Sequence, residues 1–448
     1  MSGPNMLLDA AIERAGMSHA GLASRVNAAR PDLGLRHDHA SVARWVRDHA
    51  IPRPPVPELI CEILSVAFSG PVSLSDIGMD RTGQSTPETL DRAVDQAAAL
   101  WRGDLKGRGP RTSVTGPAAI EPVWTWENPP EDRDITRTGR DRVTAHEVDR
   151  LVRARANYQE MYRRVGGVPT RPRIVALLNN EVAPLLRAAY DDPLGRQLFR
   201  AAAGLAAFAG VCAYDGDEQP LAQRHFFHAL RLAKASGDRG HGGYVVALLA
   251  NQALFRGDCR LVVQYAQTAL RAAGSELGSS LITDLHALAA KAYARMGDAV
   301  SARAHLRESE AAVARVSFGS GQVVEHSYVA PGLVETQAAE ALRRIGDLSA
   351  AQAYAEESVR TAPLTHLRGQ VHRYGGLALV LAARGEAEHA AHVGGQMLDL
   401  AEGMESGRIR DRIGTVVQAL RPARPAPPVG EFLERATWYT TEQRGNVG

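Results

Sequence analysis

The segment Gly297–Ser309 reads GDAVSARAHLRES, and the chain repeats its pattern at intervals. A glycine followed by an acidic residue also stands at Gly257, Gly346 and Gly385, so the four glycines are separated by 40, 49 and 39 residues. Small or apolar residues occupy the fifth, ninth and twelfth positions after each glycine, which in this segment are Ala302, Leu306 and Ser309. Helices that pack closely need small side chains at their contact, so a period of this length predicts stacked helical hairpins.

A fifth copy of the pattern precedes these four. Gly216-Asp217 is followed by Ala222, Phe226 and Ala229 in the same positions, with a slippage of one residue. We therefore expect an all-α fold whose larger part is an α-solenoid over residues 141–420. The Pro-rich residues 421–430 then end the array, and residues 431–439 form a last helix within a terminal segment 421–448.

A different pattern lies near the start of the chain, in the segment His39–Arg47, HASVARWVR. Asp38 is a good N-cap for this helix, and helical spacing buries Val42, Trp45 and Val46. The same spacing leaves polar or cationic side chains outward, namely His39, Ser41, Arg44 and Arg47. A helix with one apolar face on a small bundle and cations on the other has the layout of a DNA-recognition helix.

The flanking sequence predicts a small helix-turn-helix bundle over residues 1–79. Apolar spacing and capping residues indicate further helices over 6–15, 18–26 and 56–67. Residues 80–140 differ in composition, because Gly, Pro and basic residues gather between 103 and 116. We expect a linker there with one short helix near 89–101.

Two families resemble these patterns. Residues 6–79 resemble the Xre-type, lambda-repressor-like DNA-binding domain of large actinobacterial regulators, through Gly16-Met17-Ser18, Gly21-Leu22-Ala23 and Ser41-Val42-Ala43-Arg44-Trp45. The repeats resemble the tetratricopeptide repeat, whose second helix has the spacing seen in Ala222, Phe226 and Ala229. The first resemblance implies that the start and middle of the third helix touch DNA, and the outward position of Arg47 adds that residue to the set: His39, Ala40, Ser41, Arg44 and Arg47.

The two resemblances together imply a sequence-specific transcriptional regulator that binds double-stranded DNA, forms a homodimer and controls differentiation or secondary metabolism. Its repeat domain would mediate dimerisation or sense an effector. The alternative is a tetratricopeptide interaction or scaffold protein that does not bind DNA. The balance of 52 Lys+Arg against 50 Asp+Glu permits this alternative, because a net charge of +2 leaves DNA binding to a local surface.

The cysteines and the hydropathy pattern indicate a cytoplasmic protein. Cys61, Cys212 and Cys259 are far apart among apolar neighbours, so we interpret them as buried free thiols in a reducing compartment. The N-terminus has no signal-peptide pattern, and the apolar run 201–214 is too short to span a bilayer. We expect no membrane association.

No motif in the sequence predicts catalysis, a metal or a cofactor. Phosphate-binding glycine loops and nucleophile elbows are missing from the sequence, so the protein is not expected to be an enzyme. Two histidine pairs, His225/His228 and His389/His392, have i,i+3 spacing without a third ligand nearby in sequence. We interpret both pairs as surface histidines.

The long insertion 316–334 between the third and fourth glycine turns is the candidate ligand or partner site in the repeats. It concentrates aromatic and hydrogen-bonding residues, namely Phe318, Gln322, Glu325, His326 and Tyr328. Such a mixture suits a peptide or a small-molecule effector, and long loops in repeat arrays often have a function. The alternative is a surface excursion with no role.

Overall fold

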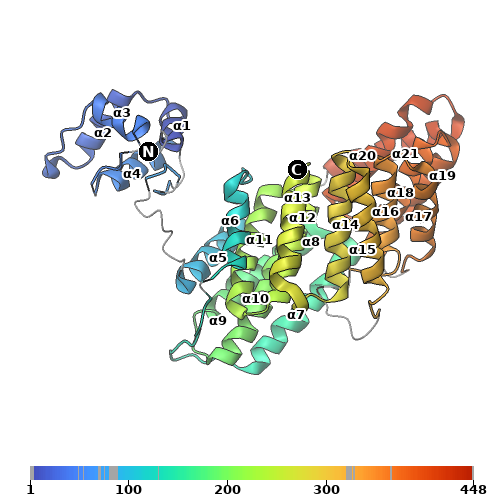
Figure 1. Cartoon of the computed structure of the whole chain (residues 1–448), viewed down its shortest axis with the longest axis horizontal. Helices are drawn as coiled ribbons and strands as arrows, with labels where there is room; N and C mark the ends of the chain where they lie inside the picture. Colours follow the sequence, from blue (N-terminus) through green and yellow to red (C-terminus); the bar gives the residue numbers. More distant parts are fainter. Residues whose placement is uncertain are drawn as a thin grey trace. The chain divides into compact units, whose positions relative to one another are not determined.

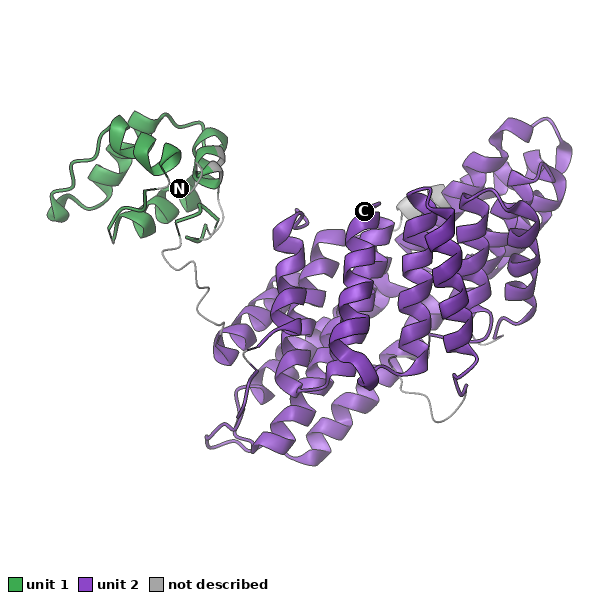
Figure 2. Ribbon diagram, in the orientation of Figure 1, with its two compact units in different colours: residues 1–88 green, residues 89–448 purple. Residues whose placement is uncertain are grey.

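The computed structural model describes residues 5–48, 50–53, 55–68, 72–74, 76–79, 89–129, 131–318, 325, 328–363 and 366–445. Over these residues the chain is helical, with two isolated β-bridges and no strand. The chain divides into two compact units, residues 1–88 and 89–448 (Figures 1 and 2). The expected all-α fold is confirmed.

The first unit is a small bundle formed by α1 (Met6–Arg14), α2 (His19–Ala29), α3 (His39–Arg47) and α4 (Val56–Phe68), with a 3-10 turn at Pro31–Leu33. Leu8, Leu22, Val42 and Leu64 are fully buried in its core. The Asn5 side-chain amide donates to the carbonyl of Ile77 at 2.9 Å, and Ile77 itself is fully buried. The end of the bundle is thereby tied to its beginning.

The second unit contains a stack of antiparallel helix pairs (Figure 1). The pairs are α10 (Asp192–Asp215) with α11 (Gln219–Ser236), α12 (Arg239–Phe255) with α13 (Cys259–Ala273), α14 (Ser279–Arg295) with α15 (Ala299–Val313), α16 (Leu333–Arg344) with α17 (Leu348–Arg360), and α18 (Leu367–Ala383) with α19 (Ala387–Ala401). Every residue that the repeat pattern places at the fifth, ninth and twelfth positions is buried. The unit is a tetratricopeptide-like α-solenoid.

Further helices flank the stack. On its N-terminal side lie α7 (Ala145–Val165), α8 (Gly167–Leu177), a π-helical turn (Leu178–Val182) and α9 (Ala183–Leu185). On its C-terminal side lie α20 (Gly407–Leu420), a 3-10 turn (Arg421–Ala423) and α21 (Pro427–Gly445). Within the stack, a further 3-10 turn (Gly274–Glu276) follows α13. Helix α21 packs on α19 and α20, so the predicted last helix exists and is longer than expected.

The expected linker over residues 80–140 is wrong for residues 89–140. These residues belong to the second unit and form two helices, α5 (Leu90–Leu105) and α6 (Pro117–Glu127). Helix α5 packs on α11 and α8, and α6 packs on α11 and α13. Trp101 and Trp126 are almost fully buried at these contacts, and the apolar area that they remove from water holds the segment on the repeats.

The glycine turns have the backbone that the repeat pattern needs. Gly257, Gly297, Gly346 and Gly385 have φ between +83° and +85°, a region that residues with a Cβ rarely adopt. In the first hairpin, Asp217 has φ +68° and takes the left-handed place, whereas Gly216 has φ −76°. This shift of the left-handed residue by one position explains the slippage seen in the sequence.

A buried carboxylate joins the two ends of the repeat array. Asp215, at the end of α10, is fully buried and accepts from the Gly167 backbone N–H at 2.8 Å and from the Ser406 hydroxyl at 2.8 Å. Its Oδ1 also accepts from Nε of Arg368 at 3.0 Å. Helices α8, α10, α18 and the start of α20 therefore meet at one point. We call this group of four residues the Asp215 clasp.

Helix α10 is the one described helix that is long and apolar enough to cross a membrane, with a mean hydropathy of 1.2 over its most apolar window. In the structure, 78% of that window is buried inside the second unit. The helix packs against α7, α8, α11 and α12. Its apolar character thus supplies the core of the repeat array.

Substitution of a turn glycine tests the repeat geometry. Gly297→Ala should lower the free energy of unfolding by about 1–2 kcal/mol, because the added Cβ disfavours a left-handed backbone. Gly414→Ala is the matched control, since this glycine lies inside α20 and its Cβ would meet nothing within 4 Å. It should raise the thermal midpoint, because alanine favours a helix. Equal effects of the two substitutions, measured by calorimetry, would contradict the assignment of the turns.

Candidate functional site

Helix α3 is held rigidly in the first unit. The Asp38 carboxylate accepts from the Ser41 backbone N–H at 2.8 Å, which caps the helix. Before the cap, the Asn27 side chain donates to the His37 carbonyl at 2.8 Å and accepts from the His37 N–H at 2.9 Å. These contacts pin the long connection between α2 and α3. Trp45 is 5% exposed and meets the His37 ring edge-on, at 5.1 Å between ring centroids.

The outer face of α3 carries most of the predicted DNA-contacting residues. His39, Ala40, Arg44 and Arg47 are exposed, whereas Val42, Trp45 and Val46 are buried as predicted. The expected outward position of Ser41 is wrong, because its side chain is 8% exposed and its hydroxyl donates to Asp38 at 2.8 Å. The capping box holds this hydroxyl, so Ser41 contributes to the start of the helix rather than to its outer face.

Several exposed arginines surround this face without a nearby acid. In the described part of the first unit, Arg30 is the one arginine with a carboxylate within 4 Å, since it pairs with Asp32 at 2.7 Å. The arginines of this unit that are exposed without such a partner in the described residues are Arg14, Arg25, Arg36, Arg44, Arg47 and Arg53. No described carboxylate neutralises these cations at close range, and DNA binding by a nearly neutral chain would depend on such local charges.

The residues of the insertion 316–334 are placed very differently from one another. Phe318 is 44% exposed, whereas Glu325 is 7% exposed and contacts the repeats. The Tyr328 hydroxyl donates to the Asp284 carboxylate on α14 at 2.7 Å. Gln322 and His326 lie outside the described residues. A ligand site at this insertion stays a prediction, and two of its residues are already engaged by the repeat core.

Glu325 lies in a polar cluster between α7, α10 and α12. Its Oε1 is 3.3 Å from Nη1 of Arg200 and 3.8 Å from Nε of Arg155. Burial raises the pKa of Glu325, but the charges of Arg155, His241 and Arg200 outweigh it and lower the pKa to about 2. Gly204 leaves room for the carboxylate, because an added Cβ would lie 3.2 Å from Oε1. We call Glu325, Arg155, Arg200 and His241 the Glu325 cluster.

His241 is the member of the Glu325 cluster with unused hydrogen-bonding groups. Its side chain is 2% exposed, and neither ring nitrogen has a hydrogen-bond partner among the described residues. Burial lowers the pKa of His241 to about 4, although the Glu325 charge opposes this shift. A neutral, buried and unpaired imidazole can both donate to and accept from a bound group.

The histidine pairs do not form a metal site in the described structure, where no group of three metal-ligating side chains occurs. His389 and His392 are exposed, as predicted. The prediction of a surface position is wrong for His225, which is fully buried with Nε2 at 2.9 Å from Asp104 on α5. His228 is only partly exposed, and burial lowers its pKa to about 4. The distant position of Asp104 in the sequence hides this pairing.

Comparisons with known proteins cover the two units differently. Residues 8–80 match the family model described as the SP15 N-terminal domain, which corresponds to the first unit. No curated protein matches the chain. The chain is also similar to a solved structure described as "Crystal Structure of Rap Protein Complexed with Competence and Sporulation Factor". That similarity has 12% identity and a TM-score of 0.43, over 78% of this chain and 98% of that chain.

The charge of Glu325 should stabilise the second unit. Glu325→Gln should cost about 3 kcal/mol at pH 7, because it removes the buried counter-charge of Arg155 and leaves Arg200 with Asp238 alone. Folding lowers the pKa of Glu325 below the unfolded value of about 4.3, so its contribution is present above about pH 5 and is lost toward pH 2.

Thermal unfolding of both proteins between pH 3 and pH 7 measures this contribution. The exposed Glu402→Gln provides the control and should have little effect at any pH. A difference between wild type and Glu325→Gln that does not shrink as the pH falls would show that the charge of Glu325 is not what stabilises the fold.

Proposed function

We propose that this protein is a DNA-binding transcriptional regulator in which α3 enters the major groove of double-stranded DNA. The observation that carries the proposal is the outer face of α3, where exposed Arg44 and Arg47 have no carboxylate within 4 Å in the described residues. Arg44 lies one turn after Ala40 and suits a base edge, because arginine pairs well with guanine there. Arg47, at the end of the helix, suits a phosphate.

The rigidity of α3 supports this proposal. Sequence readout needs side chains held by a fixed backbone, and α3 is fixed by its capping box, by Asn27 and by the buried ring of Trp45. Ala40 and His39 complete a surface of short side chains at the helix start, where close approach to a groove is sterically allowed.

The repeat unit would supply the regulatory part of this function. In the Glu325 cluster, Arg155, Arg200 and an imidazole without a hydrogen-bond partner in the described residues surround one carboxylate, and Arg200 also pairs with Asp238 at 2.8 Å. A peptide or small-molecule effector with a carboxylate group can form the same ion pairs that Glu325 forms. Repeat arrays transmit small changes between neighbouring units, so binding there can alter how two reader units are presented in a dimer. A tetratricopeptide scaffold without DNA binding is the competing function, favoured by the overall charge of only +2.

Arginine substitutions on α3 test the proposal. Arg44→Ala should weaken binding to a selected double-stranded operator by about 10- to 100-fold, the usual effect of losing one base contact. The matched control is Arg30→Ala, because the charge of Arg30 is already paired with Asp32 through two hydrogen bonds. Fluorescence anisotropy with labelled DNA gives both affinities.

A second variant distinguishes the loss of a DNA contact from the loss of the folded structure. Trp45→Ala should destabilise the first unit by about 3 kcal/mol or more, because it leaves a cavity in the core. Arg44→Ala should leave the unfolding transition unchanged. Normal operator affinity in a folded Arg44→Ala protein would disprove the proposed orientation of α3, and failure of the wild type to bind any selected DNA would favour the scaffold function.

A further inference from the structure

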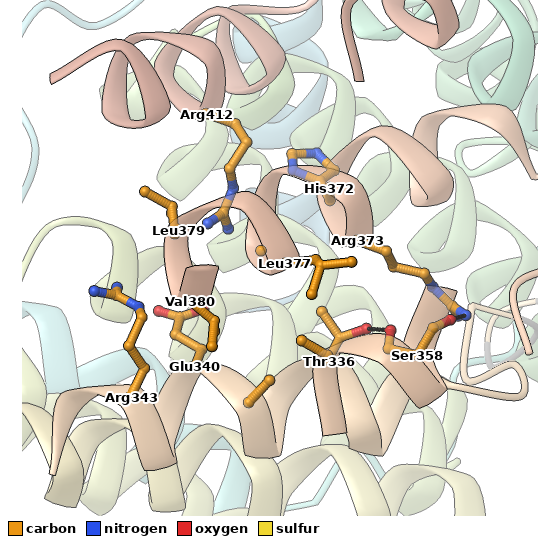
Figure 3. Close-up of a pocket in the computed structure, with 13 residues that line it drawn as sticks. Thr336, Glu340, Arg343, Ser358, His372, Arg373, Leu377, Leu379, Val380 and Arg412 are labelled. Carbon is orange, nitrogen blue, oxygen red and sulfur yellow. Dashed lines mark hydrogen bonds between the residues drawn. The ribbon is translucent and has the colours of Figure 1, made fainter. Parts of the chain in front are cut away.

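A second polar site lies in the C-terminal half of the repeats, where α16, α17, α18 and α20 surround a small pocket (Figure 3). One wall is apolar and is formed by Ala339, Ala355, Leu377, Leu379 and Val380. The remaining lining is polar, and it is dominated by basic side chains. None of the described residues of the insertion 316–334 lines this pocket.

The pocket has more positive than negative charge. Glu340 is its one lining carboxylate, and it already accepts from Arg295 at 2.9 Å with Lys291 at 3.7 Å. Arg343 and Arg412 also line the pocket, and neither has a carboxylate within 4 Å in the described part of the chain. Figure 3 shows Arg412 extending from α20 toward the side of the pocket where Glu340 and Arg343 lie.

This excess of positive charge is unfavourable when no anion is bound. Burial lowers the pKa of Arg412, and repulsion from Arg408 and Arg295 acts in the same direction against the attraction of Glu340. Burial also lowers the pKa of His372, so its imidazole is neutral near pH 7 and offers hydrogen bonding without another charge. Glu340 attracts Arg412 but also pairs with Arg295 and Lys291, so a bound anion would add negative charge where cations are in excess.

The backbone is shaped to hold Arg412 in this position. A Cβ on Gly375 would lie 2.7 Å from Cγ of Arg412, so only glycine lets the arginine stem cross α18 there. The neighbouring Gly376 lines the pocket, and a Cβ on it would meet nothing within 4 Å. The missing side chain at Gly375 therefore makes room for the Arg412 stem. The missing side chain at Gly376 leaves space inside the pocket.

We propose that this pocket binds the oxyanion group of a small ligand, a phosphate or a carboxylate, between Arg412 and Arg343. Guanidinium groups suit both anions because their planar N–H groups can bind two oxygens at once. The pocket is narrow, so it takes the anionic end of a ligand rather than a whole cofactor. The site is independent of DNA binding by α3 and of the Glu325 cluster.

The test measures the thermal midpoint of the full-length protein against increasing inorganic phosphate, with chloride adjusted to hold the ionic strength constant. A parallel titration uses acetate. A ligand that binds only the folded state raises the midpoint, and above its Kd the rise grows with the logarithm of the ligand concentration. We expect such a logarithmic rise with at least one anion, and the anion that acts at the lower concentration identifies the class of ligand.

Three variants localise the effect. Arg412→Met keeps the stem of the side chain but removes its charge, so it should weaken the anion response at least tenfold without lowering the midpoint in chloride alone. Arg410→Met is the matched control, because Arg410 lies on the same helix and does not line the pocket. It should respond as the wild type does. Gly376→Leu should abolish the response by filling the pocket while leaving every charge in place.

Two outcomes would overturn the proposal. The first is a wild-type midpoint that depends only on ionic strength and is the same in phosphate, acetate and chloride. The second is an Arg412→Met protein that keeps the wild-type anion response, since this would place the bound anion elsewhere. Either result can be obtained whether or not the protein binds DNA.

Discussion

The repeat unit depends on the buried carboxylate of Asp215. Repeat arrays normally hold together through contacts between neighbours alone, which leaves their curvature soft. Here Asp215 joins residues that are far apart in the chain, with Gly167 on one side and Arg368 and Ser406 on the other. A charge with no solvent exposure must keep all its partners, so the clasp fixes the first helices of the array against the last.

Local sequence signals determined the parts of the fold that could be predicted. The start of α3 was predictable because Asp38 and the spacing of Val42 and Trp45 act within one or two helical turns. The hairpins were predictable because each left-handed turn needs a glycine, and the spacing of these glycines gives the repeat length. In the first hairpin Asp217, rather than a glycine, has the left-handed backbone. The small and apolar positions of that hairpin are accordingly shifted by one residue in the sequence.

Long-range packing determined what could not be predicted. Helices α5 and α6 were missed as parts of the repeat unit, because the Gly- and Pro-containing stretch between them resembles a linker until Trp101 and Trp126 are seen buried on the repeats. In the Glu325 cluster, the insertion pointed to Glu325, but Arg155, Arg200 and His241 come from three separate helices. The sequence marks the surroundings of His241 only weakly, through the glycines on either side of it. A run of glycines in a helix indicates close packing, and Gly242 indeed packs directly against the Trp126 ring.

The proposed DNA-binding face and the proposed anion site belong to different units of the chain. Arg44 and Arg47 lie on α3 of the first unit with no carboxylate within 4 Å in the described residues, and the pocket proposed to bind an anion lies in the second unit. The central proposal is that α3 contacts DNA. The most direct test of this contact is the salt dependence of DNA binding by the full-length protein. We predict that log affinity falls linearly with log salt concentration, and that Arg47→Ala makes the slope shallower by about one. An affinity independent of salt, or an unchanged slope for Arg47→Ala, would contradict the claim.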